Sequence, residues 1–265
     1  MPRTMQPAYP RPPAPLRLAS AESVFQNARE YFDKGELPLF GSIFADEQNA
    51  GHGQYNRAWE SRRGNVHAAI RLPLAGVWQT AASAAALAAL IADELEALGY
   101  AVLIKWPNDI VALTHKGAAK AGGILLKEIG GLLTAGIGLN LSWAPGADLL
   151  REGAALPAGK LADAVPLHQN APGASHARIN DPYLLWCRIA ARIAREDPLE
   201  LLERWRALAE DYLLWEGENI SVLDPEGPGS GRIEGRLFGL SSEGELVIQS
   251  HARMISCLRG SLTRN

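Results

Sequence analysis

Two lysines in short polar motifs are the side chains best suited to chemistry. Lys120 opens the motif Lys120-Ala121-Gly122-Gly123-Ile124-Leu125-Leu126, and Lys105 opens Lys105-Trp106-Pro107-Asn108-Asp109-Ile110. Glycines let a ligand approach the backbone closely, and a cation held beside them stabilises an anion. The glycine pair therefore favours Lys120 as an anion-binding group over the alternative, a solvated loop lysine.

The motif that Lys105 opens also predicts a turn. Pro107 bends the chain, and the Asn108 and Asp109 side chains can bond to the local backbone. Such a turn can also contribute to a functional site. Trp106 is expected in the hydrophobic core.

A third motif is Gly136-Ile137-Gly138-Leu139-Asn140-Leu141. Glycines inside a strand often mark the close approach of a ligand. In this order the three motifs resemble the catalytic core of biotin protein ligases, enzymes that activate biotin with ATP and attach it to a carrier lysine. The resemblance runs from about Ser20 to Leu262.

The resemblance implies a role for each candidate residue. Lys120 is expected to contact the reacting carboxylate and phosphate, with Arg57 as the second catalytic residue. Asp109 either orients Lys120 or contacts Mg²⁺. The nucleotide is expected to contact Arg57, Trp59, Lys105, Asn108 and, at adenine, Asn140. The biotin site would comprise Ser23, Gln48, Gly51, His52, Gly53, Gln54, Lys120, Gly122 and Gly123.

The adenylate-binding loop departs from the family pattern, which is Gly-Arg-Gly-Arg-Arg-Gly-Arg with Trp two positions later. The matching positions are Gly51, Gly53, Arg57 and Trp59, and the differing ones are His52, Gln54, Tyr55 and Asn56. Guanidinium groups that could fork onto phosphate are therefore absent. This difference predicts a weaker hold on the acyl-adenylate.

The first helix shows a second departure. The family commonly has Asp-Ser-Thr-Asn there, which bonds the biotin ureido group, whereas this chain has Glu22-Ser23-Val24-Phe25. A buried polar group without a partner costs about 1–3 kcal/mol. Either biotin binds more weakly here, or the preferred acid differs.

Composition sets broad limits on the function. The chain has 265 residues, 47% hydrophobic and 21% charged, which is typical of a soluble globular protein. A net charge of -3 gives no general reason to expect nucleic-acid binding. Two distant cysteines, Cys187 and Cys257, favour a reducing cytoplasm over a disulfide framework. No segment is apolar for long enough to span a bilayer, and the N-terminus does not resemble a signal peptide.

The pattern of elements predicts an α+β fold, a hairpin-rich sheet with helices followed by a small β-barrel. The resemblance to biotin protein ligases implies a mixed, mostly antiparallel sheet like that of class II synthetases, and an SH3-like barrel at the C-terminal end. Three segments are expected: a proline-rich tail at 1–19, a catalytic domain at 20–214 and the barrel at 215–265. The expected helices cover 20–33, 77–98, 182–195 and 198–213. The expected strands cover 37–45, 66–72, 100–105, 110–113, 123–129 and 132–141, and then 219–223, 231–240, 245–250 and 254–259. A long loop is expected from 145 to 182.

These observations favour a biotin–[carboxyl carrier protein] ligase. ATP with Mg²⁺ and biotin are the expected substrates, without a permanently bound metal. The expected partner is a biotin carboxyl carrier domain, with no DNA and no membrane, and the protein itself a monomer or weak homodimer. Two alternatives remain: a lipoate- or octanoate-type ligase, and a ligase-like binding protein with weak or no catalysis.

Overall fold

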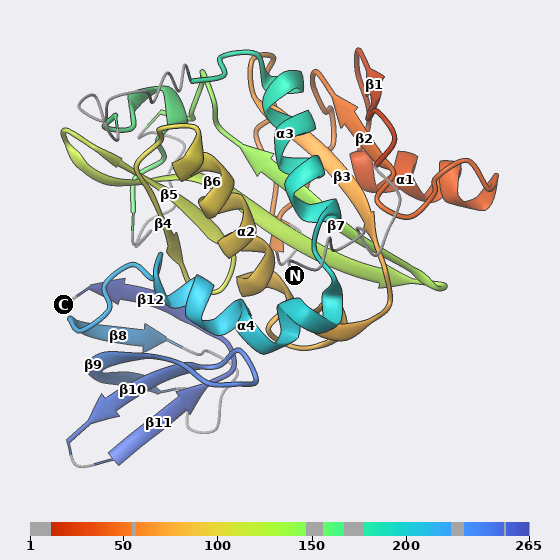
Figure 1. Cartoon of the computed structure of the whole chain (residues 1–265). Coiled ribbons are helices and arrows are strands. Elements are labelled where there is room, and N and C mark those ends of the chain that lie inside the picture. The colour runs from red at the N-terminus through yellow and green to blue at the C-terminus, as the bar shows by residue number, and fades with distance from the viewer. Residues whose placement is uncertain are drawn as a thin grey trace, which may run out of the picture.

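A computed structural model describes residues 12–54, 57–146, 156–166, 178–223, 231–251 and 253–264. A large sheet with helices occupies most of the molecule, and a smaller sheet lies below it at the C-terminal end (Figure 1). Within the described ranges, no helix is both long and apolar enough to cross a membrane. Most of residues 1–15 and 145–182, for which the sequence predicts a tail and a loop, lie outside the described residues.

The large sheet has seven strands in the order β1-β2-β3-β7-β6-β5-β4. Their bounds are Leu16–Leu18 (β1), Ser42–Ala45 (β2), Val66–Leu72 (β3), Val102–Lys105 (β4), Asp109–Thr114 (β5), Gly117–Ile129 (β6) and Leu132–Leu139 (β7). β1 runs parallel to β2, and every other adjacent pair is antiparallel. The predicted mixed, mostly antiparallel α+β sheet is confirmed.

Four α-helices accompany this sheet: Val24–Asp33 (α1), Ser83–Ala97 (α2), Pro182–Ala194 (α3) and Pro198–Glu210 (α4). Among the residues that the structure describes, short 3-10 helices cover Gly76–Gln79 (η2) and Leu161–Asp163 (η4). Prolines begin α3 and α4, where a missing N–H costs nothing. Asp181 and Asp197 cap these two helices by accepting backbone N–H bonds.

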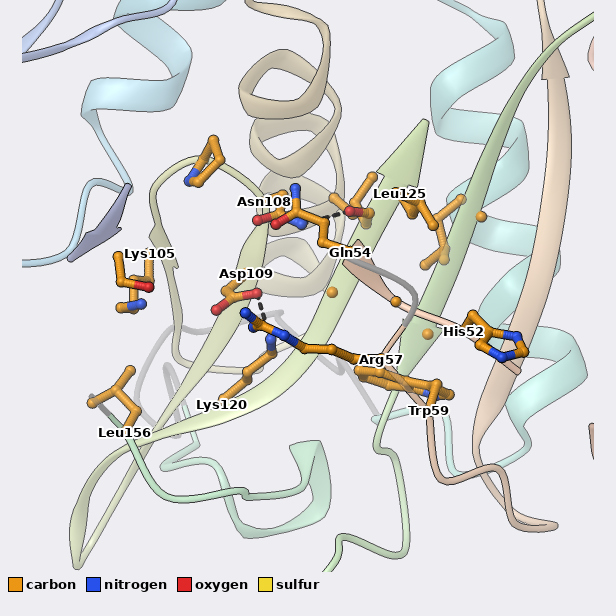
Figure 2. Close-up of a pocket in the computed structure, with 18 of the residues that line it drawn as sticks. His52, Gln54, Arg57, Trp59, Lys105, Asn108, Asp109, Lys120, Leu125 and Leu156 are labelled. Carbon is orange, nitrogen blue, oxygen red and sulfur yellow. Dashed lines mark hydrogen bonds and ion pairs between the residues drawn. The ribbon is translucent and has the colours of Figure 1, made fainter. Parts of the chain in front are cut away.

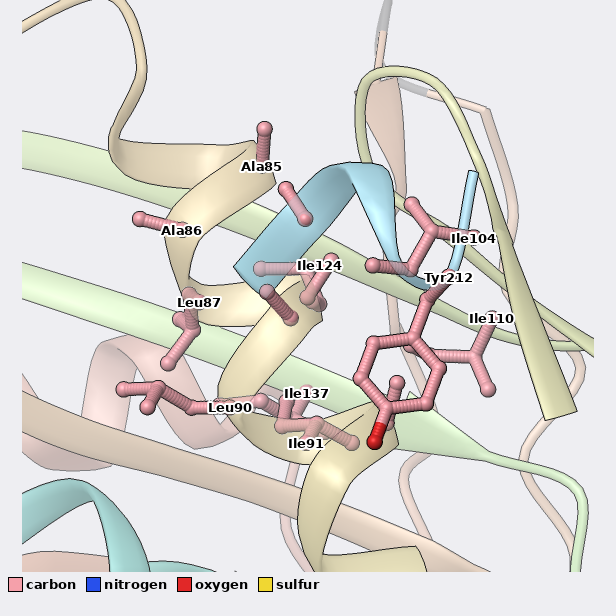
Figure 3. Close-up of a cluster of buried hydrophobic side chains, with 14 of the residues drawn as sticks. Ala85, Ala86, Leu87, Leu90, Ile91, Ile104, Ile110, Ile124, Ile137 and Tyr212 are labelled. Carbon is pink, nitrogen blue, oxygen red and sulfur yellow. The ribbon is translucent and has the colours of Figure 1, made fainter. Parts of the chain in front are cut away.

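The helices lie on opposite faces of the sheet, as β3 shows. Val66, Ala68, Ile70 and Leu72 face the main core with α2 and α3, whereas Ala69 packs in a smaller cluster with α1. In the main core, Leu87, Leu90 and Ile91 of α2 lie over Ile124 and Ile137 of the central strands (Figure 3). The alternation of strand side chains thus leaves the α1 face free to form a site.

The second sheet is antiparallel, in the order β11-β10-β9-β8-β12. Its strands are Asn219–Leu223 (β8), Arg232–Leu240 (β9), Leu246–Ser250 (β10), Arg253–Cys257 (β11) and Ser261–Arg264 (β12). Five short antiparallel strands are consistent with the expected SH3-like unit. β12 has no counterpart among the predicted strands.

Several predicted boundaries are wrong. Leu16–Leu18, assigned to the tail, pairs with β2 instead, because Leu16 aligns with Ile43 in a parallel ladder. The first helix starts after Ser23 rather than Ser20. β6 begins at Gly117, so Lys120 lies within a strand and not in a loop.

Candidate functional site

A cavity of about 1050 Å³ opens on the α1 face of the large sheet. Its walls come from the start of α1, the loop between β2 and β3, the middle of β6 and β7, and one side of the C-terminal sheet. Figure 2 shows the central part, where side chains from the loop and from β5 and β6 converge.

The floor of the cavity is formed by glycines on β7. Gly136 and Gly138 are two residues apart and therefore share a face of the strand. A Cβ at Gly136 would lie 2.4 Å from the Phe25 ring, and one at Gly138 would lie 2.6 Å from the Trp59 indole. The glycines thus make room for two aromatic rings that line the cavity.

The cationic part of the cavity lies next to this floor. Lys120 Nζ and Asp109 Oδ1 are 2.6 Å apart and join β6 to β5. Gly123 pairs with Gly138 of the neighbouring strand and lies beside both charged side chains. A Cβ added at Gly123 would lie 3.8 Å from Asp109 Oδ1 and 3.9 Å from Lys120 Cε. The Lys120 ammonium is therefore held by a carboxylate beside Gly123, next to the Trp59 ring.

Lys105 is a second cation facing this region. Burial lowers the pKa of its ammonium group, the nearby Lys120 lowers it further, and Asp109 opposes both effects. Lys105, Asp109 and Lys120 therefore form one electrostatically coupled group.

Asn108 fixes the turn that carries this group. It is 7% exposed, and its Nδ2 donates a 2.6 Å bond to the carbonyl oxygen of Ile124. The backbone N–H of Ile124 in turn donates to the Asn108 carbonyl. The turn is thereby attached to β6 at two points.

The loop above the floor closes on itself. Gly53 N–H donates to the Arg57 carbonyl at 2.7 Å, and Trp59 N–H donates to the Gly51 carbonyl at 2.9 Å. Figure 2 shows the Arg57 side chain extending from this loop towards Asp109 and Lys120. Tyr55 and Asn56, two of the divergent positions, lie outside the described residues.

Gln48 makes contacts within the protein through both ends of its amide. Its Oε1 accepts a 2.9 Å bond from the N–H of Val24, the first residue of α1, and its Nε2 donates to Ser61 Oγ at 3.2 Å. Ser23, the residue before α1, makes no capping bond with its own side chain. Gln48 therefore satisfies the first N–H of α1 and positions the helix end that carries Phe25.

Asn140 lies at the wall of the cavity but is only 4% exposed. Its Nδ2 donates to the Gly159 carbonyl at 3.1 Å, and its Oδ1 accepts from Asn65 Nδ2 at 3.5 Å. The contact of Asn140 with adenine stays a prediction.

Most of the predicted site residues meet in this one cavity. They are Ser23, Gln48, His52, Gly53, Gln54, Arg57, Trp59, Lys105, Asn108, Asp109, Lys120, Gly123 and Asn140. Gly51 and Gly122 are not part of its wall. Gly122 instead permits close strand packing, since a Cβ there would lie 2.5 Å from the Leu139 side chain.

Sequence reasoning named no individual residue of the C-terminal sheet as part of the site. Arg232, Arg259, Ser261 and Thr263 line the far end of the cavity. They follow no motif, so only their position in space associates them with Lys120. Within the described ranges, no group of three or more His, Cys, Asp or Glu side chains could hold a metal ion.

Residues 20–142 match the sequence model of the biotin/lipoate A/B protein ligase family. A biotin–[acetyl-CoA-carboxylase] ligase of Paracoccus denitrificans is 35% identical over 126 residues, which make up 43% of this chain. The aligned part spans only half the length of that relative.

Solved structures resemble this chain over nearly its whole length, the C-terminal sheet included. The biotin protein ligase of Aquifex aeolicus, solved with biotin and ATP, has a TM-score of 0.68 and 21% identity, covering 95% of this chain and 99% of its own. A biotin protein ligase-like protein of unknown function from a Silicibacter species has a TM-score of 0.57 and 14% identity, covering 95% and 96%. At these identities the likeness establishes the fold.

Proposed function

We propose that this protein is an ATP-dependent biotin protein ligase. In the first step the biotin carboxylate attacks the α-phosphorus of ATP, pyrophosphate leaves, and biotinyl-AMP forms. In the second step the ε-amine of a carrier lysine attacks the acyl carbon, AMP leaves, and an amide bond forms. The observation that carries this proposal is the Lys120–Asp109 pair beside Gly123, inside a cavity of a ligase-family region.

The cavity suits a reaction between two anions. A carboxylate and a phosphate repel each other, so they need cations that are already in place before the ligands arrive. Lys120, Lys105 and Arg57 supply such cations, and Asp109 keeps Lys120 oriented towards the glycine floor. Trp59 packs directly on Gly138, and its indole forms part of the cavity wall beside which the acyl group would lie.

The proposal extends to the partners and the organisation of the chain. ATP would enter as its Mg²⁺ complex, and the carrier would be the biotin carboxyl carrier domain of a carboxylase. The similarity to a ligase named for acetyl-CoA carboxylase supports this choice. We place the catalytic domain at 20–214 and the C-terminal unit at 215–265, in the cytoplasm, as a monomer or weak homodimer acting without DNA.

Pyrophosphate release with biotin, lipoate or octanoate, each with and without ATP, tests the first step. Mass spectrometry of an added carrier domain tests the second. We expect ATP-dependent pyrophosphate release with biotin and a mass increase on one carrier lysine. Biotin binding without pyrophosphate release would indicate a binding protein and contradict the proposal.

The position of the Phe25 ring favours a second candidate function, that of a lipoate- or octanoate-type ligase. Its ring covers Gly136 at the α1 end of the cavity, and the amide of Gln48 is occupied by Val24 and Ser61. A ureido group placed there would meet an apolar ring and few free partners, at a cost of about 1–3 kcal/mol per unpaired group.

The double variant Val24→Thr/Phe25→Asn distinguishes the two candidates, because it restores the residues typical of the family. For a biotin ligase with a weakened site, the variant should raise activity with biotin about tenfold or more relative to octanoate. Gln26→Ala, an exposed change on the same helix, is the matched control. A wild-type preference for octanoate that the double variant reverses would favour the second candidate.

A further inference from the structure

A turn of the C-terminal sheet contacts the motif that carries Lys105 and Asp109. The indole of Trp106, in the middle of this motif, is 2% exposed. Its Nε1–H donates a 2.9 Å hydrogen bond to the carbonyl oxygen of Gly244, in the turn between β9 and β10. This bond joins the motif to the second sheet across 138 residues of sequence.

The β9–β10 turn is itself closely held. Gly244 has a φ of +87°, and a Cβ there would lie 2.6 Å from the Cα of Ala82, the residue before α2. The hydroxyl oxygen of Ser241 accepts bonds from the N–H groups of Glu243 and Glu245 and closes the turn. The Gly244 carbonyl therefore has a fixed position relative to the large sheet.

The strand before Trp106 is also attached to the chain that leads into the C-terminal sheet. Ile104 N–H donates to the Tyr212 carbonyl at 2.7 Å, and Leu214 N–H donates to the Ile104 carbonyl at 2.9 Å. On the other side of Trp106, Asn108 is bonded to Ile124 of β6. The motif is thus held between β6 on one side and the C-terminal part of the chain on the other.

We propose that the Trp106–Gly244 bond makes the C-terminal sheet part of the acid-activating machinery, with Trp106 as the positioning residue that holds Lys105 and Asp109 in place beside Lys120. This inference rests on the proposed function. It assigns the C-terminal sheet a role in forming the acyl-adenylate, through the position that its turn gives to Trp106 at the cavity wall. The hydrogen bond is buried and directional, so its loss would let the motif shift relative to β6.

Trp106→Phe tests the proposal, because it removes the N–H donor and keeps an aromatic ring. Trp78→Phe is the matched control: Trp78 is equally buried, and its Nε1 has no hydrogen-bond partner in the described part of the chain. In pyrophosphate release we expect Trp106→Phe to lower kcat about five- to tenfold, with KM for the acid within about twofold. Trp78→Phe should leave both constants near the wild-type values.

The pH profile separates positioning from a general loss of stability. Burial lowers the pKa of Lys105, so a loosened motif that admits water should move this pKa upwards towards the ordinary lysine value. The alkaline limb of the rate profile should shift to higher pH in Trp106→Phe but not in Trp78→Phe. NMR titration of the Lys105 ammonium measures the same shift without any turnover.

A second pair of variants acts on the turn. Ser241→Ala removes the hydroxyl that closes it, whereas Ser242→Ala alters an exposed neighbour. We expect Ser241→Ala to slow pyrophosphate release about two- to threefold and Ser242→Ala to leave it unchanged. In the double variant Ser241→Ala/Trp106→Phe, the rate should fall by less than the product of the two single effects, because both changes act on the same contact.

The inference would be overturned if Trp106→Phe had the same kcat and the same pH profile as Trp78→Phe. If Trp106→Phe does not fold, equal rates for Ser241→Ala and Ser242→Ala would overturn it instead. No pyrophosphate from the wild type with any acid would refute the proposed function separately, and the Lys105 titration would then test only whether the Trp106–Gly244 bond positions Lys105.

Discussion

Three side chains, Lys105, Asp109 and Lys120, define the charge of the candidate site. Only one of the three is an anion, and it lies 2.6 Å from Lys120. The arrangement therefore retains a net positive charge for an incoming carboxylate and phosphate. This excess charge is useful for binding anions but is costly for the folded protein without them.

Lys120→Ala should abolish most acid activation without unfolding the protein. Removing a preorganised cation at a reacting anion costs several kcal/mol, so we expect pyrophosphate release to fall by about two orders of magnitude or more. Lys116→Ala, an exposed change in the turn between β5 and β6, is the control. Release near the wild-type rate from folded Lys120→Ala would show that this lysine does not contact the reacting groups.

Lys105→Met should stabilise the fold at neutral pH while lowering activity about tenfold or more. Because the pKa of Lys105 is lowered by burial, the unfolded chain binds its proton more strongly than the folded protein does. The resulting penalty is complete below the folded pKa and disappears as pH rises to the ordinary lysine value.

Urea unfolding at neutral and at alkaline pH measures this effect. The gain in unfolding free energy from Lys105→Met should be largest at neutral pH and should shrink in the alkaline range. Lys116→Met, which changes an exposed lysine, should show no such dependence. If Lys105→Met lowered the unfolding free energy at neutral pH, burial would not be disfavouring the charged form of Lys105 in the folded protein.

Among the structural elements, the loop between β2 and β3 departs most from the family pattern. Its backbone is closed by bonds from Gly53 to Arg57 and from Trp59 to Gly51. His52 and Gln54 project from it at the cavity wall, at positions where the resemblance implies arginine. The loop therefore presents fewer cations to an adenylate than the resemblance would imply.

His52→Arg/Gln54→Arg should slow release of the acyl-adenylate about tenfold, because a hydrogen bond to a charged group contributes about 1.5–3 kcal/mol. Stopped-flow measurement of adenylate dissociation gives the rate. Gln249→Arg, which adds one arginine at an exposed site away from the cavity, is the control for added positive charge. Equal release rates in the three proteins would mean that other groups already retain the intermediate.

Across the whole molecule, the helices opposite the cavity are connected by a charged network. Arg192 of α3 pairs with Asp93 of α2 at 2.8 Å and with Glu196, and Glu196 also pairs with Arg204 of α4. Arg192 is 17% exposed in its side chain and Glu196 only 8%. The network therefore bridges three helices through two largely buried side chains, with Asp93 and Arg204 partly exposed at its ends.

Arg192→Ala should lower the free energy of unfolding by about 3 kcal/mol, because it leaves the buried Glu196 carboxylate with fewer partners. Chemical denaturation measures the loss, with the exposed Arg195→Ala as control. The KM for the carboxylic acid substrate should be the same in Arg192→Ala as in the wild type, since the network lies on the face opposite the cavity. A loss below about 1 kcal/mol would show that solvent screens these charges.

The sequence by itself determined the fold class, most of the elements and the chemical character of the site. Alternating apolar residues in Val66–Leu72 predicted β3 correctly, since strand periodicity is a local property. The three ordered motifs and the upstream loop also carried a resemblance that anticipated the meeting of Lys120, Asp109 and Trp59 in one cavity.

Only the tertiary structure decided which groups come from far along the chain. Leu16–Leu18 became a strand because β2 offered a free edge, and Arg232 and Arg259 reached the cavity because the second sheet packs beside it. The bond from Trp106 to Gly244 likewise depends on packing between two sheets. Contacts between distant segments leave no periodic pattern in either segment, because each residue's partner is fixed by the packing of the whole chain and not by its neighbours.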